Sequence, residues 1–156
     1  MSDRDLDDLD RAIIYELQAD ARKSSTSEIA ERMDVAASTV RTRIRRLEDD
    51  GILTGYHAAV DYEAAGFQLH TLIVCTAPVP DRESLARAAN DVEGVVAVRE
   101  VMTGNENVHV EVVGRDGDDL SRIGRELDAL GLEIEDEHIV RNEYVHPYSG
   151  FAAHDG

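Results

Sequence analysis

Lysine is almost absent from this chain: Lys23 is the only one in 156 residues, whereas aspartate and glutamate together number 33. The formal net charge is −17. A composition with many acidic residues and almost no lysine resembles that of proteins from salt-accumulating cells, where counterions screen the repulsion between like charges. We therefore expect a halophilic protein that needs salt to keep its structure.

Cysteine and long apolar runs are scarce as well. Cys75 is the only cysteine, which excludes an intrachain disulfide and suits a reducing compartment. No apolar run approaches the about 18 residues that a membrane-spanning helix needs. The acidic N-terminus lacks the apolar core of a secretory signal. We expect a cytoplasmic protein with no membrane partner.

The sequence lacks the patterns of catalytic and metal sites. Its six histidines are scattered, with no H-x-x-x-H or C-x-x-C spacing. We find no nucleophile–base pair and no phosphate-binding loop. The sequence therefore predicts no catalytic residue, no metal site and no cofactor, and we do not expect an enzyme. Cys75 lies among apolar residues and is expected in the core, because a redox thiol needs exposure and a depressed pKa.

The most informative stretch runs from residue 25 to residue 51. Ser25 and Glu28 form a capping box, which predicts the start of a short helix. Asp34 marks a tight turn, because aspartate tolerates left-handed backbone angles. A second helix is expected over about Ala37–Asp50, with Gly51 as its stop signal. Two helices joined by a tight turn are typical of a helix-turn-helix unit.

The second of these helices carries hydroxyls near its start and arginines further along. Between residues 20 and 47 there are seven basic and four acidic residues, so positive charge is local. Hydroxyls and guanidinium groups suit phosphate and base edges in the major groove. We predict that the exposed face reads double-stranded DNA through Ser38, Thr39, Arg41, Thr42, Arg45 and Arg46. The alternative is a solvated face whose arginines pair with Glu48, Asp49 and Asp50.

The rest of the chain predicts an α+β architecture. An N-terminal apolar stripe closes a three-helix unit, and the β-prone stretch 52–61 is a candidate for a short wing or a linker. We expect the order βαββαβ, a ferredoxin-like fold, from segments 68–77, 82–90, 95–102, 108–113, 117–130 and 132–145. Its second sheet face needs cover, which predicts a homo-oligomer. The expected divisions are 1–53, a hinge at 54–66, a domain at 67–148 and a flexible tail at 149–156.

The helical half of the chain contains a series of short motifs in a fixed order: Leu9-Asp10, Ile13-Ile14, Ile29-Ala30, Ser38-Thr39-Val40, Arg43-Ile44, Leu47-Glu48, Gly51-Ile52 and Gly55-Tyr56. This series resembles the N-terminal pattern of the Lrp/AsnC family of feast-or-famine transcription factors. The resemblance extends less strongly over the C-terminal half, through Val98, Val101 and Thr103-Gly104.

The resemblance implies a (winged) helix-turn-helix domain followed by a ferredoxin-like ligand and assembly domain. It implies a homodimer, or a tetramer or octamer, that binds a small-molecule effector between subunits, an amino acid or a related metabolite. The effector-binding residues would be Thr103, Gly104, Asn105, Asn107 and His109.

Two positions depart from the family pattern. Ala36 stands where the family has a capping serine, so Ser38 is the candidate cap. Asn105 and Asn107 replace acids in the turn, for which Gly104 is expected to supply a positive φ. Two other functions stay open: a small-molecule-binding oligomer without DNA activity, and a regulator that senses metal or redox state.

Overall fold

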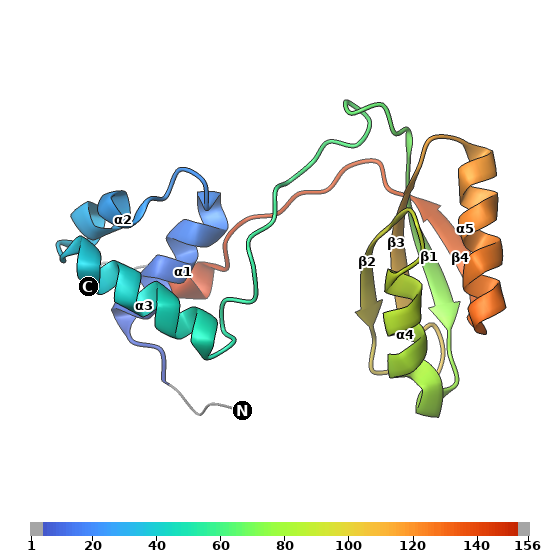
Figure 1. Ribbon diagram of the computed structural model, residues 1–156, viewed down its shortest axis with the longest axis horizontal. Helices are drawn as coiled ribbons and strands as arrows, with labels where there is room; N and C mark the ends of the chain where they lie inside the picture. The colour runs from blue at the N-terminus through green and yellow to red at the C-terminus, as the bar shows by residue number, and fades with distance from the viewer. Residues whose placement is uncertain (1–4, 153–156) are drawn as a thin grey trace. The chain divides into compact units, whose positions relative to one another are not determined.

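The computed structural model describes residues 5–152. The chain forms two compact units (Figure 1). One contains the residues up to Ala58 together with those from Tyr144 onward, and the other is Ala59–Glu143. Among the described residues, no helix has both the length and the apolar character needed to cross a bilayer.

The first unit contains three helices around one apolar core. These helices are α1 (Asp8–Asp20), α2 (Thr26–Met33) and α3 (Ala37–Asp49). The fully buried side chains at its centre are Ile13, Ile29, Val40 and Leu47. Because these residues recur at helical spacing, each helix places one apolar face inward.

The predicted helix boundaries in this unit are confirmed. Ser25 Oγ accepts the backbone amide of Glu28 at 3.2 Å, and Glu28 Oε2 accepts that of Ser25 at 2.9 Å. Asp34 ends α2 with a φ of 53°, the left-handed geometry expected of the turn. The last helix ends at Asp49, one residue earlier than expected, and Gly51 follows with a φ of 70°.

A pair of carboxylates on and beside α1 holds α3 in place. Arg43 Nη1 lies 2.5 Å from Asp7 Oδ2 and 3.0 Å from Asp10 Oδ1. The Asp10 side chain is 1% exposed, whereas that of Arg43 is 24% exposed. The backbone amide of Asp10 and the Arg43 guanidinium hold the pKa of Asp7 below its usual value. Arg43 therefore lies toward the helical core.

The second unit is a four-stranded antiparallel sheet with the strand order β2-β3-β1-β4. Its elements are β1 (Leu69–Thr76), α4 (Arg82–Asn90), β2 (Val95–Glu100), β3 (Val108–Gly114), α5 (Gly117–Leu130) and β4 (Glu133–Ile139). Both helices cover the same face of the sheet (Figure 1). This is the predicted ferredoxin-like βαββαβ fold.

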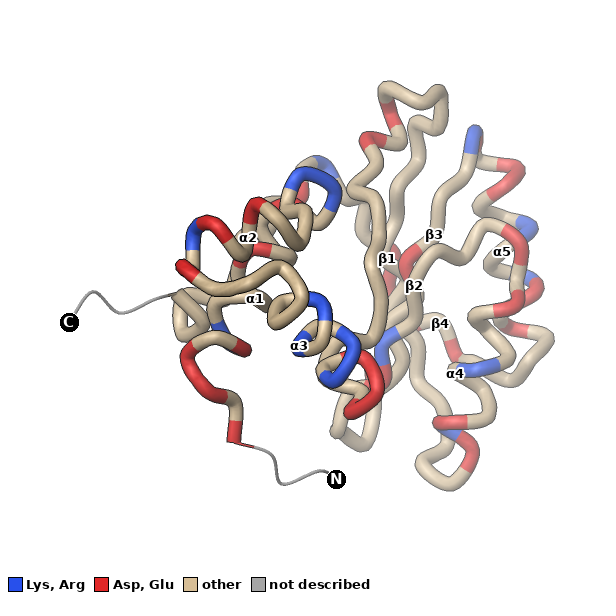
Figure 2. Tube along the Cα trace, turned by 60° about the vertical axis from the view of Figure 1, so that its left-hand side comes forward, with Lys and Arg blue, Asp and Glu red and all other residues tan. Residues whose placement is uncertain are grey.

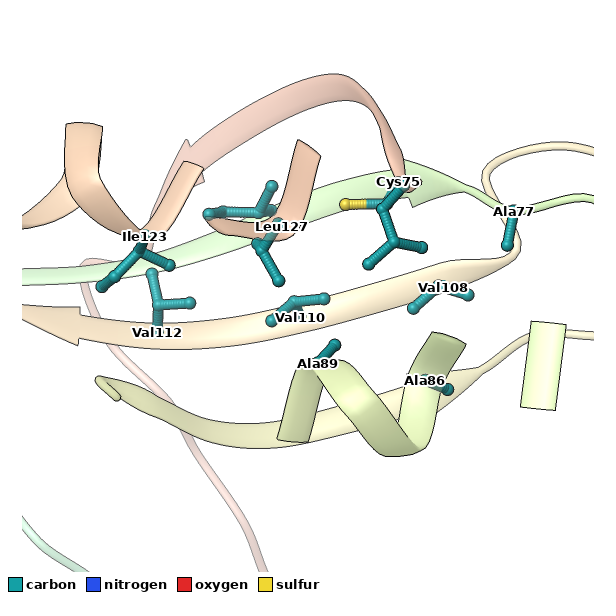
Figure 3. Packing of buried hydrophobic residues seen from close by; sticks show 11 residues of the cluster. Cys75, Ala77, Ala86, Ala89, Val108, Val110, Val112, Ile123 and Leu127 are labelled. Atoms are coloured by element: carbon teal, nitrogen blue, oxygen red, sulfur yellow. The ribbon is translucent and has the colours of Figure 1, made fainter. Parts of the chain in front are cut away.

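Alternate residues of the central strands build the core of this unit. Val108, Val110 and Val112 of β3 are fully buried against Ile123 and Leu127 of α5 (Figure 3). The intervening residues His109 and Glu111 lie on the sheet face that the helices leave uncovered. The period of two along β3 thus separates an apolar core from a polar face.

Two expectations differ from the structure. The last strand was expected to reach residue 145 but ends at Ile139, because the backbone partners on β1 run out at His70, which accepts the amide of Val140. Of the two alternatives for residues 52–61, a wing or a linker, the structure favours the linker, because these residues form no strand within the described chain.

The predicted flexible tail is also partly wrong. Ser149–Phe151 forms a short 3-10 helix, and the Phe151 side chain packs against the core of the first unit. The tail residues 153–156 lie outside the described residues.

The Arg43 ion pairs predict a specific loss of stability. We expect Arg43→Met to lower the free energy of unfolding by about 3 kcal/mol at neutral pH, because it removes a cation that pairs with both Asp7 and the buried Asp10 carboxylate. Since the folded-state pKa of Asp7 is lowered, its stabilisation is present above its unfolded-state pKa and is lost as pH falls through the folded value. The difference between wild type and variant should therefore shrink on acidification below about pH 4. Urea unfolding at a series of pH values measures both effects.

Arg41→Met is the matched control, because Arg41 is exposed on the same helix and takes part in no ion pair within residues 5–152. Its effect should stay within about 0.5 kcal/mol. Equal losses for the two variants would contradict the structural role of Arg43.

Candidate functional site

All six residues predicted to read DNA lie exposed on α3. They are Ser38, Thr39, Arg41, Thr42, Arg45 and Arg46. Figure 2 shows basic positions gathered along this helix, with acidic positions following at its end. Across residues 5–152, no ion pair involves Arg41, Arg45 or Arg46. Their guanidinium groups are therefore available to an external anion, unlike that of Arg43.

One acid that could have neutralised these arginines is bound elsewhere. Glu48 Oε1 accepts a hydrogen bond of 2.8 Å from the Tyr56 hydroxyl. Partial burial and this carboxylate raise the pKa of Tyr56 to about 12, so the phenol stays protonated and continues to donate. Glu48 therefore does not support the alternative in which acids at the end of α3 pair with the arginines of the same helix.

The start of α3 differs from the expectation for Ser38. No side chain caps this helix, so Ser38 does not replace the missing serine at Ala36. Instead the Ser38 carbonyl accepts a hydrogen bond of 2.9 Å from Thr42 Oγ1, one turn along the helix. Ala36 has the extended backbone of a cap residue but no hydroxyl, and Ser38 is already inside the helix, past the position from which a side chain reaches the first amides.

Four of the five predicted effector residues belong to the segment that connects β2 and β3, and the fifth, His109, lies on β3 itself. Thr103, Gly104 and Asn105 are exposed there. The segment is held at both ends: the amide of Glu106 donates to Thr76 Oγ1 at 2.7 Å, and Arg82 Nη1 donates to the Val101 carbonyl at 3.3 Å. The exposed tip is thus presented on a fixed base, and nothing in the sequence pattern had marked Arg82 for this role.

Asn107 is misplaced in the predicted effector set. Its side chain is fully buried. The Asn107 Oδ1 atom accepts the amide of Ala77 at 2.8 Å, and its Nδ2 group donates to the Ala77 carbonyl at 2.9 Å. Because both halves of the amide bind the chain's own backbone, Asn107 joins β3 to the end of β1 and offers nothing to a ligand.

Gly104 does not supply the positive φ that was expected of it. The left-handed residue in this turn is Glu106, with a φ of 49°. A Cβ atom added at Gly104 would meet nothing within 4 Å. Neither backbone geometry nor packing within the chain therefore requires glycine here, which leaves close approach of another molecule as a reason for it.

The uncovered sheet face carries linked polar side chains beside apolar ones. Glu111 accepts from His70 Nε2 at 2.6 Å and from Arg99 Nη1 at 3.3 Å. The ring of His109 lies 2.9 Å from the Glu106 carbonyl, which brings it toward the predicted effector turn. Leu72, which pairs with Glu111 in the strand register, lies on the same face. This surface combines the Leu72 side chain with the Arg99–Glu111 ion pair and the His70–Glu111 hydrogen bond.

Cys75 and the histidines do not form a sensor site in the described chain. Burial, together with the charges of Glu135 and Glu137, raises the pKa of Cys75 to about 11. A protonated buried thiol is the opposite of a redox-reactive cysteine. Within residues 5–152, no group of three or more histidine, cysteine, aspartate or glutamate side chains could hold a metal ion.

Comparison with known proteins first identifies the helical unit. Residues 6–54 match the family model described as winged helix-turn-helix DNA-binding. An uncharacterized HTH-type transcriptional regulator from Pyrococcus furiosus is 32% identical over 136 residues, which are 86% of this chain and 90% of that protein. The HTH-type transcriptional regulator LrpA from Pyrococcus horikoshii is 32% identical over 121 residues, 76% of this chain and 82% of that protein.

A further relative matches over a shorter length. LrpA from Mycobacterium tuberculosis is 40% identical over 83 residues, which are 53% of this chain and 55% of that protein. This chain therefore matches only about half the length of that relative in the sequence comparison.

Solved structures extend the similarity to nearly the whole chain. The crystal structure of Mycobacterium tuberculosis LrpA matches with a TM-score of 0.73 at 29% identity, covering 96% of this chain and 99% of that chain. The feast or famine regulatory protein from the same organism, complexed with L-methionine, matches with a TM-score of 0.76 at 26% identity, covering 90% and 95%. The helical unit and the sheet unit thus occur together in those regulators.

The placement of Asn107 predicts that two nearby asparagines respond differently to mutation. We expect Asn107→Ala to lower the free energy of unfolding by about 2–4 kcal/mol, because the buried backbone amide and carbonyl of Ala77 both lose their hydrogen bonds to the Asn107 side chain. Asn105→Ala, at an exposed position in the same turn, should change it by less than about 0.5 kcal/mol. Thermal and urea unfolding of both variants check this. Similar stability of the two would show that the buried amide is dispensable.

Proposed function

The chain belongs to the Lrp/AsnC family of helix-turn-helix transcriptional regulators, and from this membership we propose that it binds promoter DNA through α3 under the control of a small-molecule effector. The observation that carries the proposal is that Arg41, Arg45 and Arg46 of α3 are exposed and form no ion pair within residues 5–152, although the chain as a whole is acidic. The proposed role is that of a DNA-binding switch without catalysis.

In the proposed complex, α3 lies in the major groove. Thr39 and Ser38 near its start contact phosphate, together with the uncapped backbone amides of the first turn. Arg41, Arg45 and Arg46 reach phosphate or guanine further along the helix. A homodimer would present two such helices to half-sites about one helical turn, or about 34 Å, apart on a pseudo-palindromic site.

The effector is proposed to bind at the turn between β2 and β3, where another subunit meets it. Thr103, Gly104, Asn105 and His109 form the proposed contact set, and Asn107 supports it from beneath. The open space beside Gly104 lets a ligand approach the backbone. The L-methionine complex of the structural relative supports an amino acid as the class of effector. Binding at a subunit interface would couple the effector to assembly and thus to DNA affinity.

The uncovered sheet face supports the proposed homo-oligomer. It carries Leu72 beside the hydrogen-bonded His70–Glu111 pair and the Arg99–Glu111 ion pair, and such a mixed surface suits a self-complementary interface. We propose a dimer as the basic unit, with tetramers or octamers built from it. The acidic composition further supports action in a salt-rich cytoplasm, where screening weakens bulk charge and favours direct contacts to bases.

Substitution of the arginines tests the DNA-binding surface. Arg45→Ala and Arg46→Ala should each weaken binding to a promoter fragment by about 1–3 kcal/mol, because each removes a contact to phosphate or base. Loss of a phosphate contact should also reduce the slope of log K against log salt concentration by about one unit. Fluorescence anisotropy across a series of KCl concentrations measures both quantities.

Arg125→Ala is the control, since Arg125 is exposed on α5 in the other unit. The Arg125→Ala variant should bind DNA with the same affinity as wild type. If Arg45→Ala and Arg46→Ala also bind like wild type, α3 is not the reader. If binding vanishes at the salt concentration where the fold is most stable, the proposed salt-rich setting is wrong.

Substitution of Gly104 tests the effector site. At least one L-amino acid should raise the unfolding temperature of wild type, since a ligand that binds only the folded state stabilises it. Gly104→Ala should keep its fold but lose most of that shift, because the added methyl group meets nothing within the chain yet blocks a ligand. Thermal shift assays with the twenty amino acids measure this.

Gly117→Ala serves as the control, because its added Cβ also meets open space, far along the chain at the start of α5. It should retain the full ligand shift. A wild-type protein that responds to no amino acid would exclude this effector class, and an undiminished shift in Gly104→Ala would exclude this site.

A further inference from the structure

The segment after β4 returns to the helical unit and becomes part of it. The Phe151 side chain packs against the core that contains Ile13 and Ile29. Its ring meets that of Tyr148 edge to face, with the ring centres 5.1 Å apart and the planes at 88°. The backbone amide of Tyr148 donates to Gln18 Oε1 of α1 at 3.3 Å. Residues 130 positions apart in sequence are thereby joined.

The place where Phe151 packs is close to the turn that orients α3. A cavity of about 450 Å³ is lined by Phe151, by Leu9 and Ala12 of α1, and by Met33 and Val35. Met33 is the last residue of α2, and Val35 follows the left-handed Asp34 in the turn before α3. The amide of Val35 donates to the Ala30 carbonyl at 3.0 Å, which closes the end of α2. Phe151 thus shares one cavity with both sides of the turn.

We infer that Phe151 is a positioning residue for the DNA-reading helix, acting through α1 and the turn at Met33–Val35. The inference rests on the proposed DNA binding by α3. Without the ring, the cavity that Met33 and Val35 line enlarges, and the core against which both side chains pack loses part of its cover. The turn then samples more than one geometry, and α3 no longer presents its arginines in a single orientation. Packing of this kind holds functional side chains in the orientation that binding requires.

Three variants of the full chain test this inference: Phe151→Ala, Phe151→Leu and Tyr144→Ala. Tyr144 is the control because its side chain is 89% exposed in the same returning segment. Circular dichroism first sets a temperature at which every variant is folded. At that temperature, Phe151→Ala should bind a promoter fragment about tenfold more weakly, while Phe151→Leu, which refills much of the space, should recover most of the affinity. Tyr144→Ala should match wild type.

Amide hydrogen exchange gives a readout that does not involve DNA. In Phe151→Ala the amides of Asp34 and Val35 should exchange faster than in wild type, while those of β1 and β3 should be unchanged. Unchanged exchange at the turn overturns the inference. So does faster exchange with full DNA affinity in the folded variant, because Phe151 would then only stabilise the domain. A wild-type chain that binds no DNA defeats the proposed function, and the exchange data still decide whether Phe151 holds the turn.

Discussion

The presentation of the basic face depends on the ion pairs that Arg43 forms with Asp7 and Asp10. A helix that reads DNA must be held by one side while its other side stays free. Here four of the seven basic residues between positions 20 and 47 lie on α3, and the one nearest the core is neutralised by α1. The contact orients the helix and also divides its arginines by task. Arg43 pairs with carboxylates of the chain itself, whereas Arg41, Arg45 and Arg46 are exposed and are the residues proposed to contact DNA.

The same division between support and function recurs at the turn between β2 and β3. Asn107 and Arg82 fix the base of the turn through backbone groups, while Thr103, Gly104 and Asn105 stay exposed. A ligand that meets this turn therefore finds a preformed surface and does not pay for ordering it. In both places, residues of the same type differ in their surroundings. Arg43 pairs with carboxylates on and beside α1 and Asn107 binds the backbone of Ala77, whereas Arg45 and Asn105 are exposed.

Local patterns predicted most of the fold, because they report interactions between near neighbours. The capping box at Ser25, the turn at Asp34 and the alternation along β3 are all decided within a few residues. The errors arose where distant partners decide. β4 ends at Ile139 because β1 runs out, and Asn107 is buried because Ala77 lies opposite it. Phe151 offered one signal that was overlooked: a large apolar side chain in a stretch otherwise rich in glycine, serine and alanine. For the candidate site, spacing along α3 identified the exposed face, whereas only the structure shows that Arg41, Arg45 and Arg46 form no ion pair within residues 5–152.

The packing of Phe151 on α1 also bears on how the protein is made. The helical domain receives this core side chain only after the whole sheet domain has been synthesised, since Ala59–Glu143 intervenes. Such a long-range contact forms late, because the loop must close before the contact is gained. During synthesis, the helical unit would therefore lack this packing contact until Phe151 itself has left the ribosome, and until then α1, α2 and α3 would be held together by their own contacts alone.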